Sequence, residues 1–143
     1  MASSHDPSPS QRYARVRGDH ALETAADYVE LLQDLIHERG EARVSDVAAR
    51  LGVSHVTVSK TIQRLQREGL VTTLPYRSIF LTDAGKALAE QSRTKHRIVL
   101  DFLLALGIPS DVAEIDAEGI EHHVSNDTLT AMDAFCRRTR GPN

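Results

Sequence analysis

The chain has 143 residues, which is enough for one or two small domains, and 41% of them are hydrophobic, which can supply a modest core. Its net charge is −3, from 17 lysines and arginines against 20 aspartates and glutamates, so the overall charge does not indicate a nucleic-acid partner.

A single cysteine, Cys136, excludes an internal disulfide and a cysteine-rich zinc site. No run of residues approaches the roughly 18 to 20 apolar positions of a membrane span, and MASSHDPSPS lacks the features of a secretory signal. We therefore expect a cytoplasmic protein.

The charge is distributed unevenly along the chain. Residues 1–39 carry a net charge of −3, residues 40–97 carry +5 and residues 98–143 carry −5. Such an asymmetry is evidence about partners rather than about the fold. The basic middle segment is therefore the part that favours contact with a polyanion.

The N-terminal segment is expected to be a flexible arm followed by a helix. Residues 1–19 are rich in serine, proline and small polar types and show no apolar periodicity. From Ala21 onward apolar residues recur three and four apart, and Gly40 supplies a C-terminal stop. The first helix is therefore expected between Ala21 and Gly40.

The middle segment predicts two shorter helices and a two-stranded hairpin. Their expected ranges are Val44–Leu51, Ser54–Glu68, Leu70–Leu74 and Ile79–Leu81. Gly52 lies in the turn between the two helices, and the hydroxyl of Ser54 can accept a hydrogen bond from a backbone N–H of the second helix. Pro75 and the residues after it form the hairpin turn.

Three further helices are expected after the hairpin. The first spans Asp83–Leu106, and Thr82, Ser110 and Ser125 are the expected caps of the three. The last two helices carry an apolar stripe made of Val112, Ile115, Ile120, Leu129, Met132 and Phe135. A chain this small would not easily bury that stripe alone, so we expect these helices to form a homodimer.

The order helix, glycine-containing turn, helix and hairpin is that of a winged helix-turn-helix. In VSDVAARLGVSHVTVSKTIQRLQREGLV, the residues expected to pack across the turn are Val47, Ala48, Leu51, Val56, Ile62 and Leu65. The second helix would be the recognition helix in a major groove of DNA. The residues expected to contact bases or phosphates are Ser54, His55, Thr57, Ser59, Lys60, Arg64 and, at the hairpin tip, Arg77. The alternative, a three-helix domain with a merely basic surface, is less favoured because the +5 segment coincides with this motif.

Ionisable residues outside this motif have the spacing of metal ligands on three predicted helices. The candidates are Asp27 with Glu30, the trio Glu118, Glu121 and His122 in DAEGIEHH, and His96 in RTKHRIV. A carboxylate pair on one helical face is usually only a solvated surface. The trio is more telling, because like charges three apart disfavour a helix unless a cation offsets them.

With these segments together, the chain resembles the diphtheria-toxin-repressor family of metal-dependent transcriptional repressors, and within it the manganese-responsive (MntR-type) branch. The resemblance covers about residues 21–136 and rests on DYVELL, ARVSDVAARLGVSHVTVSK and DAEGIEHHVS. It implies metal ligands at Asp27, Glu30, His96, Glu118, Glu121 and His122. The expected fold is mainly α: an arm at 1–19, a winged helix-turn-helix at 20–82, and an all-helical metal-binding and dimerisation domain at 83–143.

The resemblance also indicates the metal and the function. Iron-responsive relatives carry Met at the position of Asp27 and Cys at that of Glu118, whereas the manganese branch has carboxylates at both. Hard carboxylate oxygens with imidazoles suit Mn²⁺. The resemblance therefore implies a homodimeric repressor of manganese-uptake genes that binds double-stranded operator DNA when loaded with one or two Mn²⁺ per subunit.

Other functions are possible alternatives. The nearest is an iron- or zinc-responsive repressor of the same family, followed by a metal-independent winged-helix regulator. A metal-dependent hydrolase could also use a carboxylate and histidine cluster. It is disfavoured because no nucleophile, acid–base pair or phosphate-binding glycine loop accompanies the cluster, so we expect no enzyme.

Overall fold

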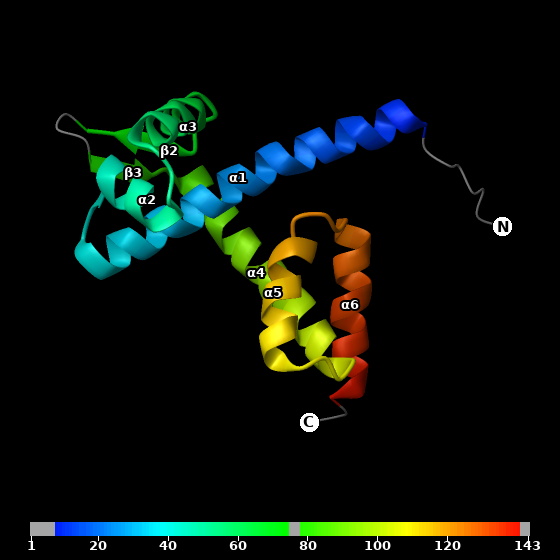
Figure 1. Cartoon of the computed structure of the whole chain (residues 1–143). Helices are drawn as coiled ribbons and strands as arrows, with labels where there is room; N and C mark the ends of the chain where they lie inside the picture. Colours follow the sequence, from blue (N-terminus) through cyan, green and yellow to red (C-terminus); the bar gives the residue numbers. More distant parts are fainter. Residues whose placement is uncertain (1–7, 75–77, 141–143) are drawn as a thin grey trace. The chain divides into compact units, whose positions relative to one another are not determined.

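The computed structural model describes residues 8–74 and 78–140, and within these the side chains of all but residues 13–23. In chain order its elements are α1 (Pro9–Arg39), β1 (Ala42–Arg43), α2 (Val44–Leu51), α3 (His55–Arg67), β2 (Val71–Thr73), β3 (Ser78–Leu81), α4 (Asp83–Ala105), α5 (Ser110–Ile120) and α6 (Asn126–Thr139) (Figure 1). The predicted fold class, mainly α with a small hairpin, is confirmed. None of the helices in the described parts of the chain combines the length and the hydropathy of a membrane-spanning segment.

The chain forms two compact units. One comprises Ala25–Arg97, and the other comprises, among the described residues, 8–24 and 98–140. The division falls within α1 and within α4, so each of these helices contributes to both units. The division into domains at residues 82 and 83 stays a prediction.

Helix α1 begins at Pro9, so the expected start at Ala21 was wrong. The Gln11 N–H donates to Ser8 Oγ at 3.4 Å, and the Ser8 N–H donates to Gln11 Oε1 at 2.8 Å. This is a capping box, and proline suits the first position of a helix because that position needs no N–H donor. The spacing Ser-x-x-Gln indicates a capping box, but the serine- and proline-rich composition of the segment led to the expectation of a flexible arm. Residues 1–7 of the expected arm lie outside the described residues.

The unit Ala25–Arg97 contains the predicted helix-turn-helix. Gly52 ends α2 with a φ of 69°, a left-handed conformation that glycine adopts without strain. The predicted cap of α3 is confirmed, since the Thr57 N–H donates to Ser54 Oγ at 3.1 Å. Thr82 likewise caps α4, accepting from the Gly85 N–H at 3.1 Å.

A three-stranded antiparallel sheet accompanies these helices. In the predicted hairpin, Val71 of β2 lies opposite Leu81 of β3. The short strand β1 was not predicted, and it pairs with the other side of β3, with Ala42 opposite Ile79. The sheet therefore joins the start of α2 to the first residues of β3.

The packing of the two helices differs from the prediction in one respect. Val47 and Ala48 of α2 are buried, as are Val58, Ile62 and Leu65 of α3. Val56 and Leu51 were expected in this core, but Val56 is 64% exposed and Leu51 is 38% exposed. The spacing of the buried positions explains the difference, because Val58, Ile62 and Leu65 recur four and three apart on one face of α3, and a residue two positions before Val58 lies off that face.

The second unit has its own core, built from α4, α5 and α6. Its buried residues are Val99, Leu103, Ala113, Ala117 and Leu129, and Ile120 and Met132 pack against them. The rings of Phe102 and Phe135 meet edge to face with centroids 5.4 Å apart. The predicted cap Ser125 is confirmed by the hydrogen bond it accepts from the Thr128 N–H, whereas Pro109, and not Ser110, is the residue that precedes α5.

The apolar stripe predicted for dimerisation is divided by this packing. Leu129, Ile120 and Met132 belong to the core of the unit itself. Ile115 is 76% exposed and Val112 is 44% exposed. Only these two members of the stripe are therefore fully available on the surface of the described chain.

Candidate functional site

The recognition helix α3 carries its predicted DNA contacts at its start. Ser54, His55, Thr57 and Lys60 are exposed there, and Ser59 is half-buried. The hydroxyls of Ser54 and Thr57 are 2.9 Å apart, so these two side chains also hold the first turn of the helix together.

The two remaining predicted contacts lie elsewhere. Arg64, further along α3, is half-buried, with its Nε 3.6 Å from Glu68 Oε1. Arg77 lies outside the described residues. The structure therefore places the exposed candidates in the first half of α3, which is the part of a recognition helix that meets base edges.

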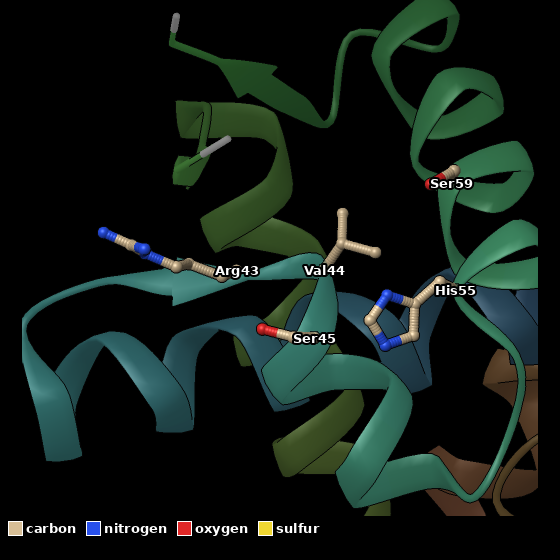
Figure 2. Close-up of a pocket in the computed structure, with 5 residues that line it drawn as sticks. All are labelled: Arg43, Val44, Ser45, His55 and Ser59. Atoms are coloured by element: carbon tan, nitrogen blue, oxygen red, sulfur yellow. The ribbon is translucent and has the colours of Figure 1, made fainter. Parts of the chain in front are cut away.

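A cleft of about 490 Å³ separates the start of α2 from the start of α3. Its lining residues are Arg43, Val44, Ser45, His55 and Ser59 (Figure 2). Figure 2 shows the His55 imidazole pointing from the first turn of α3 toward the first turn of α2. Sequence reasoning identified His55 and Ser59 but missed Arg43 and Ser45, which lie at the junction of β1 and α2.

Val56 is a second residue of this surface that sequence reasoning assigned differently. It is an apolar side chain in the first turn of the recognition helix, and it is 64% exposed. In a major groove, apolar side chains contact the methyl group of thymine. Val56 is therefore a candidate for base contact, and the periodicity of the buried residues of α3 was the signal that could have found it.

Three of the predicted metal ligands belong to the unit Ala25–Arg97. Asp27 and Glu30 lie one turn apart on α1, and His96 lies on α4, all three half-buried. Arg93 of α4 donates to Asp34 of α1 at 2.8 Å. Because Glu30 precedes Asp34 by one turn and His96 follows Arg93 by about one turn, these ligands lie on two helices in direct contact.

The other three predicted ligands lie at the end of α5. Glu118 is exposed in the last turn of the helix, and Glu121 caps its C-terminus. His122 Nε2 lies 3.4 Å from Glu121 Oε1, and the two side chains are 7% and 2% exposed. Because α5 ends at Ile120, the prediction that all three lie within one helix was wrong, and His122 belongs to the turn that follows.

The chemistry of this pair fits a divalent cation. A buried carboxylate is costly unless a positive charge or hydrogen bonds compensate it. Carboxylate oxygen and imidazole nitrogen are also the donor types that suit Mn²⁺ and other first-row divalent ions. The only cysteine of the chain, Cys136, is buried on α6.

Comparison with known proteins gives the family. The model of the iron-dependent repressor metal-binding and dimerisation domain matches residues 82–140, and the model of the iron-dependent repressor N-terminal DNA-binding domain matches residues 20–79. The chain belongs to the iron-dependent repressor family. Members of this family, also called the diphtheria-toxin-repressor family, are transcriptional regulators and not enzymes, as the sequence predicted.

Individual relatives agree with this assignment. The transcriptional regulator MntR of Escherichia coli O6:H1 is 51% identical over 88% of this chain and 81% of its own length. The HTH-type transcriptional regulator MntR of Bacillus subtilis strain 168 is 37% identical over 69% of this chain and 70% of its own. A solved structure described as a manganese-dependent transcriptional repressor complex with manganese superposes with a TM-score of 0.65 at 31% identity, over 79% of this chain. This chain spans about half of that one, 52% of its length.

In a DNA-binding regulator of this family, we expect the Lys60 ammonium group to contact a phosphate of the DNA backbone. It is exposed on α3, and a lysine that neutralises one phosphate contributes about 0.9 to the slope of log affinity against log salt concentration. We expect Lys60→Ala to weaken binding to all DNA sequences and to reduce that slope by about this amount. Fluorescence anisotropy over a series of salt concentrations measures it, with Lys60→Arg as the charge-conserving control. An unchanged slope in Lys60→Ala would contradict a phosphate contact.

Proposed function

We propose that the protein is a Mn(II)-dependent transcriptional repressor of the cytoplasm, which binds double-stranded operator DNA as a homodimer and represses manganese-uptake genes. The observation that carries the proposal is the buried pair of Glu121 and His122, which lies in the segment that matches a metal-binding domain. The MntR names of the relatives and the manganese-bound structural neighbour support the choice of metal. An iron- or zinc-responsive repressor of the same family is the alternative.

Six side chains would hold one or two Mn²⁺ ions per subunit: Asp27, Glu30, His96, Glu118, Glu121 and His122. All their donor atoms are carboxylate oxygens or imidazole nitrogens, so the set lacks the soft sulfur ligands that favour other metals. When bound, the ion supplies positive charge and a fixed coordination geometry to these groups. Affinity alone would not select Mn²⁺, because zinc binds most such sites more tightly, so selectivity depends on geometry and on metal supply.

The proposed ligands come from both compact units, and this is how metal binding would control DNA binding. Asp27, Glu30 and His96 belong to the unit with the recognition helix, and Glu121 and His122 to the other. Ligation by both would favour one placement of the units. If that placement is also the one that fits DNA, the metal and the operator both bind the same conformation more tightly. Metal binding then raises the population of the DNA-binding conformation, and operator binding becomes metal-dependent.

Homodimer formation is supported by the apolar surface of the second unit. Val112 and Ile115 of α5 and Leu104 and Leu106 near the end of α4 are exposed, and burying these large apolar side chains between two copies would stabilise a dimer. A two-fold dimer would present two recognition helices to successive major grooves. The operator would then be approximately palindromic.

A metal titration of operator binding tests the proposal. The operator is first selected from a library of random duplexes with the Mn²⁺-loaded protein, and binding of the selected duplex is then followed by fluorescence anisotropy with Mn²⁺, Fe²⁺ or Zn²⁺. We expect Mn²⁺ to raise operator affinity about 5- to 150-fold, the usual range of coupling between two binding sites. Affinity that does not depend on metal would overturn the proposal, and a response to Fe²⁺ or Zn²⁺ alone would favour the alternative.

A further inference from the structure

We propose that the cleft between the starts of α2 and α3 binds one phosphate of the DNA backbone, and that Arg43 is the side chain that holds it. This inference rests on the proposed DNA-binding function. It assigns to the operator complex a contact that lies outside the recognition helix and involves a residue of β1.

The residues that line the cleft, apart from Val44, carry hydrogen-bond donors, and one of them, Arg43, is a cation. Arg43 lies at the end of β1, directly before α2, and its side chain is 54% exposed. Ser45 contributes a hydroxyl from the first turn of α2, and His55 and Ser59 contribute donors from α3 (Figure 2). All of these can donate hydrogen bonds to an anion, and the cleft contains no carboxylate among its lining residues.

Arg43 is held by a neighbour without losing its capacity for a phosphate. Its Nε donates to Glu41 Oε1 at 3.1 Å, and Glu41 Oε2 in turn accepts from Ser78 Oγ of β3 at 3.1 Å. That bond uses one of the five N–H donors of the guanidinium group. The terminal amino groups have the planar fork geometry that binds two phosphate oxygens together. Glu41 therefore anchors Arg43 to the sheet, so that less conformational entropy is lost when a phosphate binds.

The position of the cleft favours a DNA phosphate over a free anion. His55 and Ser59 line the cleft from the same first turns of α3 that present Thr57 and Lys60 to solvent. In helix-turn-helix proteins the helix before the recognition helix crosses the DNA backbone, and contacts to the backbone set the register of the protein on the duplex. Arg43 is therefore expected to position the recognition helix and to contribute equally to all base sequences.

The test measures the salt dependence of binding of the metal-loaded full chain to the selected operator and to a scrambled duplex. We expect Arg43→Gln to weaken both complexes by the same factor and to reduce the salt slope by about 0.9, while Arg43→Lys keeps the slope. Arg50→Gln is the matched control, because Arg50 lies on α2 and is paired with a carboxylate, Glu38 at 3.0 Å, as Arg43 is with Glu41, but it does not line the cleft. That variant should keep the slope of the unaltered protein.

Ser45→Glu separates a binding role from a structural one. Ser45 is exposed in the first turn of α2, where a negative charge stabilises a helix, so this variant should melt no lower than the unaltered protein. In the cleft the same charge would face the phosphate, and we expect both duplexes to bind about tenfold more weakly or worse.

Two results would overturn the inference. One is an unchanged salt slope in Arg43→Gln when Lys60→Ala lowers it, and the other is a loss of affinity for the operator alone, which would indicate base contact. In both cases the proposed function stands. It fails separately, if the unaltered chain does not bind its operator in a metal-dependent manner.

Discussion

Replacing His122 with alanine is expected to abolish the effect of Mn²⁺ on operator binding and to leave the fold intact. The His122 ring is buried beside Glu121 at the end of α5, so the substitution would remove one ligand and the neighbour of a second. Coupling between two sites usually amounts to 5- to 150-fold in affinity, and we expect that ratio to fall to about one. The weak, metal-independent binding to DNA should remain, because α3 belongs to the other compact unit. Anisotropy with the selected operator, with Mn²⁺ and with a chelator, measures the ratio.

The next residue along the chain provides the matched control. His123 has the same chemistry as His122 but is exposed and is not among the proposed ligands. We expect His123→Ala to keep the full response to Mn²⁺. Circular dichroism of both variants checks that the helical content is unchanged. A full Mn²⁺ response in His122→Ala, with the fold intact, would show that the proposed ligand set is wrong.

Replacing Gly85 with alanine is expected to destabilise the DNA-binding unit, against the usual trend for glycine in a helix. A Cβ atom on Gly85 would overlap the carbonyl oxygen of Leu70. That oxygen also accepts the Thr82 N–H at 3.1 Å, so backbone would have to move at the junction of β2 and α4. Overpacking of this kind costs about 1–3 kcal/mol. For a unit of this size, that lowers the melting temperature by about 4–8 °C per kcal/mol.

Gly119 provides the opposite case within the same chain. Apart from its chain neighbours and the backbone of its own helix, a Cβ atom on Gly119 would have no heavy atom within 4 Å, and the backbone at this position of α5 is helical. Gly119→Ala should therefore stabilise the protein by about 0.5–1 kcal/mol, because alanine loses less conformational entropy in a helix. Thermal melts in the presence of a chelator compare the two variants without a contribution from metal. A Gly85→Ala variant that melts at or above the temperature of the unaltered protein would contradict the close contact with Leu70.

The helix ends could be predicted from the sequence because the signals for them are local. Gly40, Gly52, Gly69 and Gly107 all have positive φ, between 69° and 89°, and each follows the end of a helix as expected. Ser54 and Ser125 likewise act through the backbone three residues later. Such features depend on a few neighbouring residues, and a sequence shows those directly.

The features that were missed depend on contacts between distant residues or on competing local signals. Strand β1 has two residues, and it exists because β3, far along the chain, offers an edge to pair with. Arg43 went unnoticed for the same reason, since nothing in the sequence places the residue before α2 beside α3. Val56 and Val58 are alike in type, and the spacing of Val58 with Ile62 and Leu65 is the signal that distinguishes the buried valine from the exposed one.

The ligand types of the metal site could be identified from the sequence, whereas their environment could not. Helical spacing grouped Glu118, Glu121 and His122, but it did not indicate that α5 ends before Glu121 or that Glu121 is buried. Burial depends on the packing of the whole unit, and the end of a helix at an Ile-Glu step has no strong local signal. The assembly of all six residues around metal stays a prediction.

The double role of Ser54 has a consequence for how operator preference can diverge among related proteins. Its hydroxyl caps α3, and losing such a cap costs about 0.5–2 kcal/mol of stability. Changing Ser54 to recognise a new base would therefore weaken the folded domain at the same time. Val56 is exposed in the same first turn, and its side chain does not cap the backbone of the helix. Evolution of a new operator sequence, and laboratory selection for one, should therefore change Val56 before Ser54.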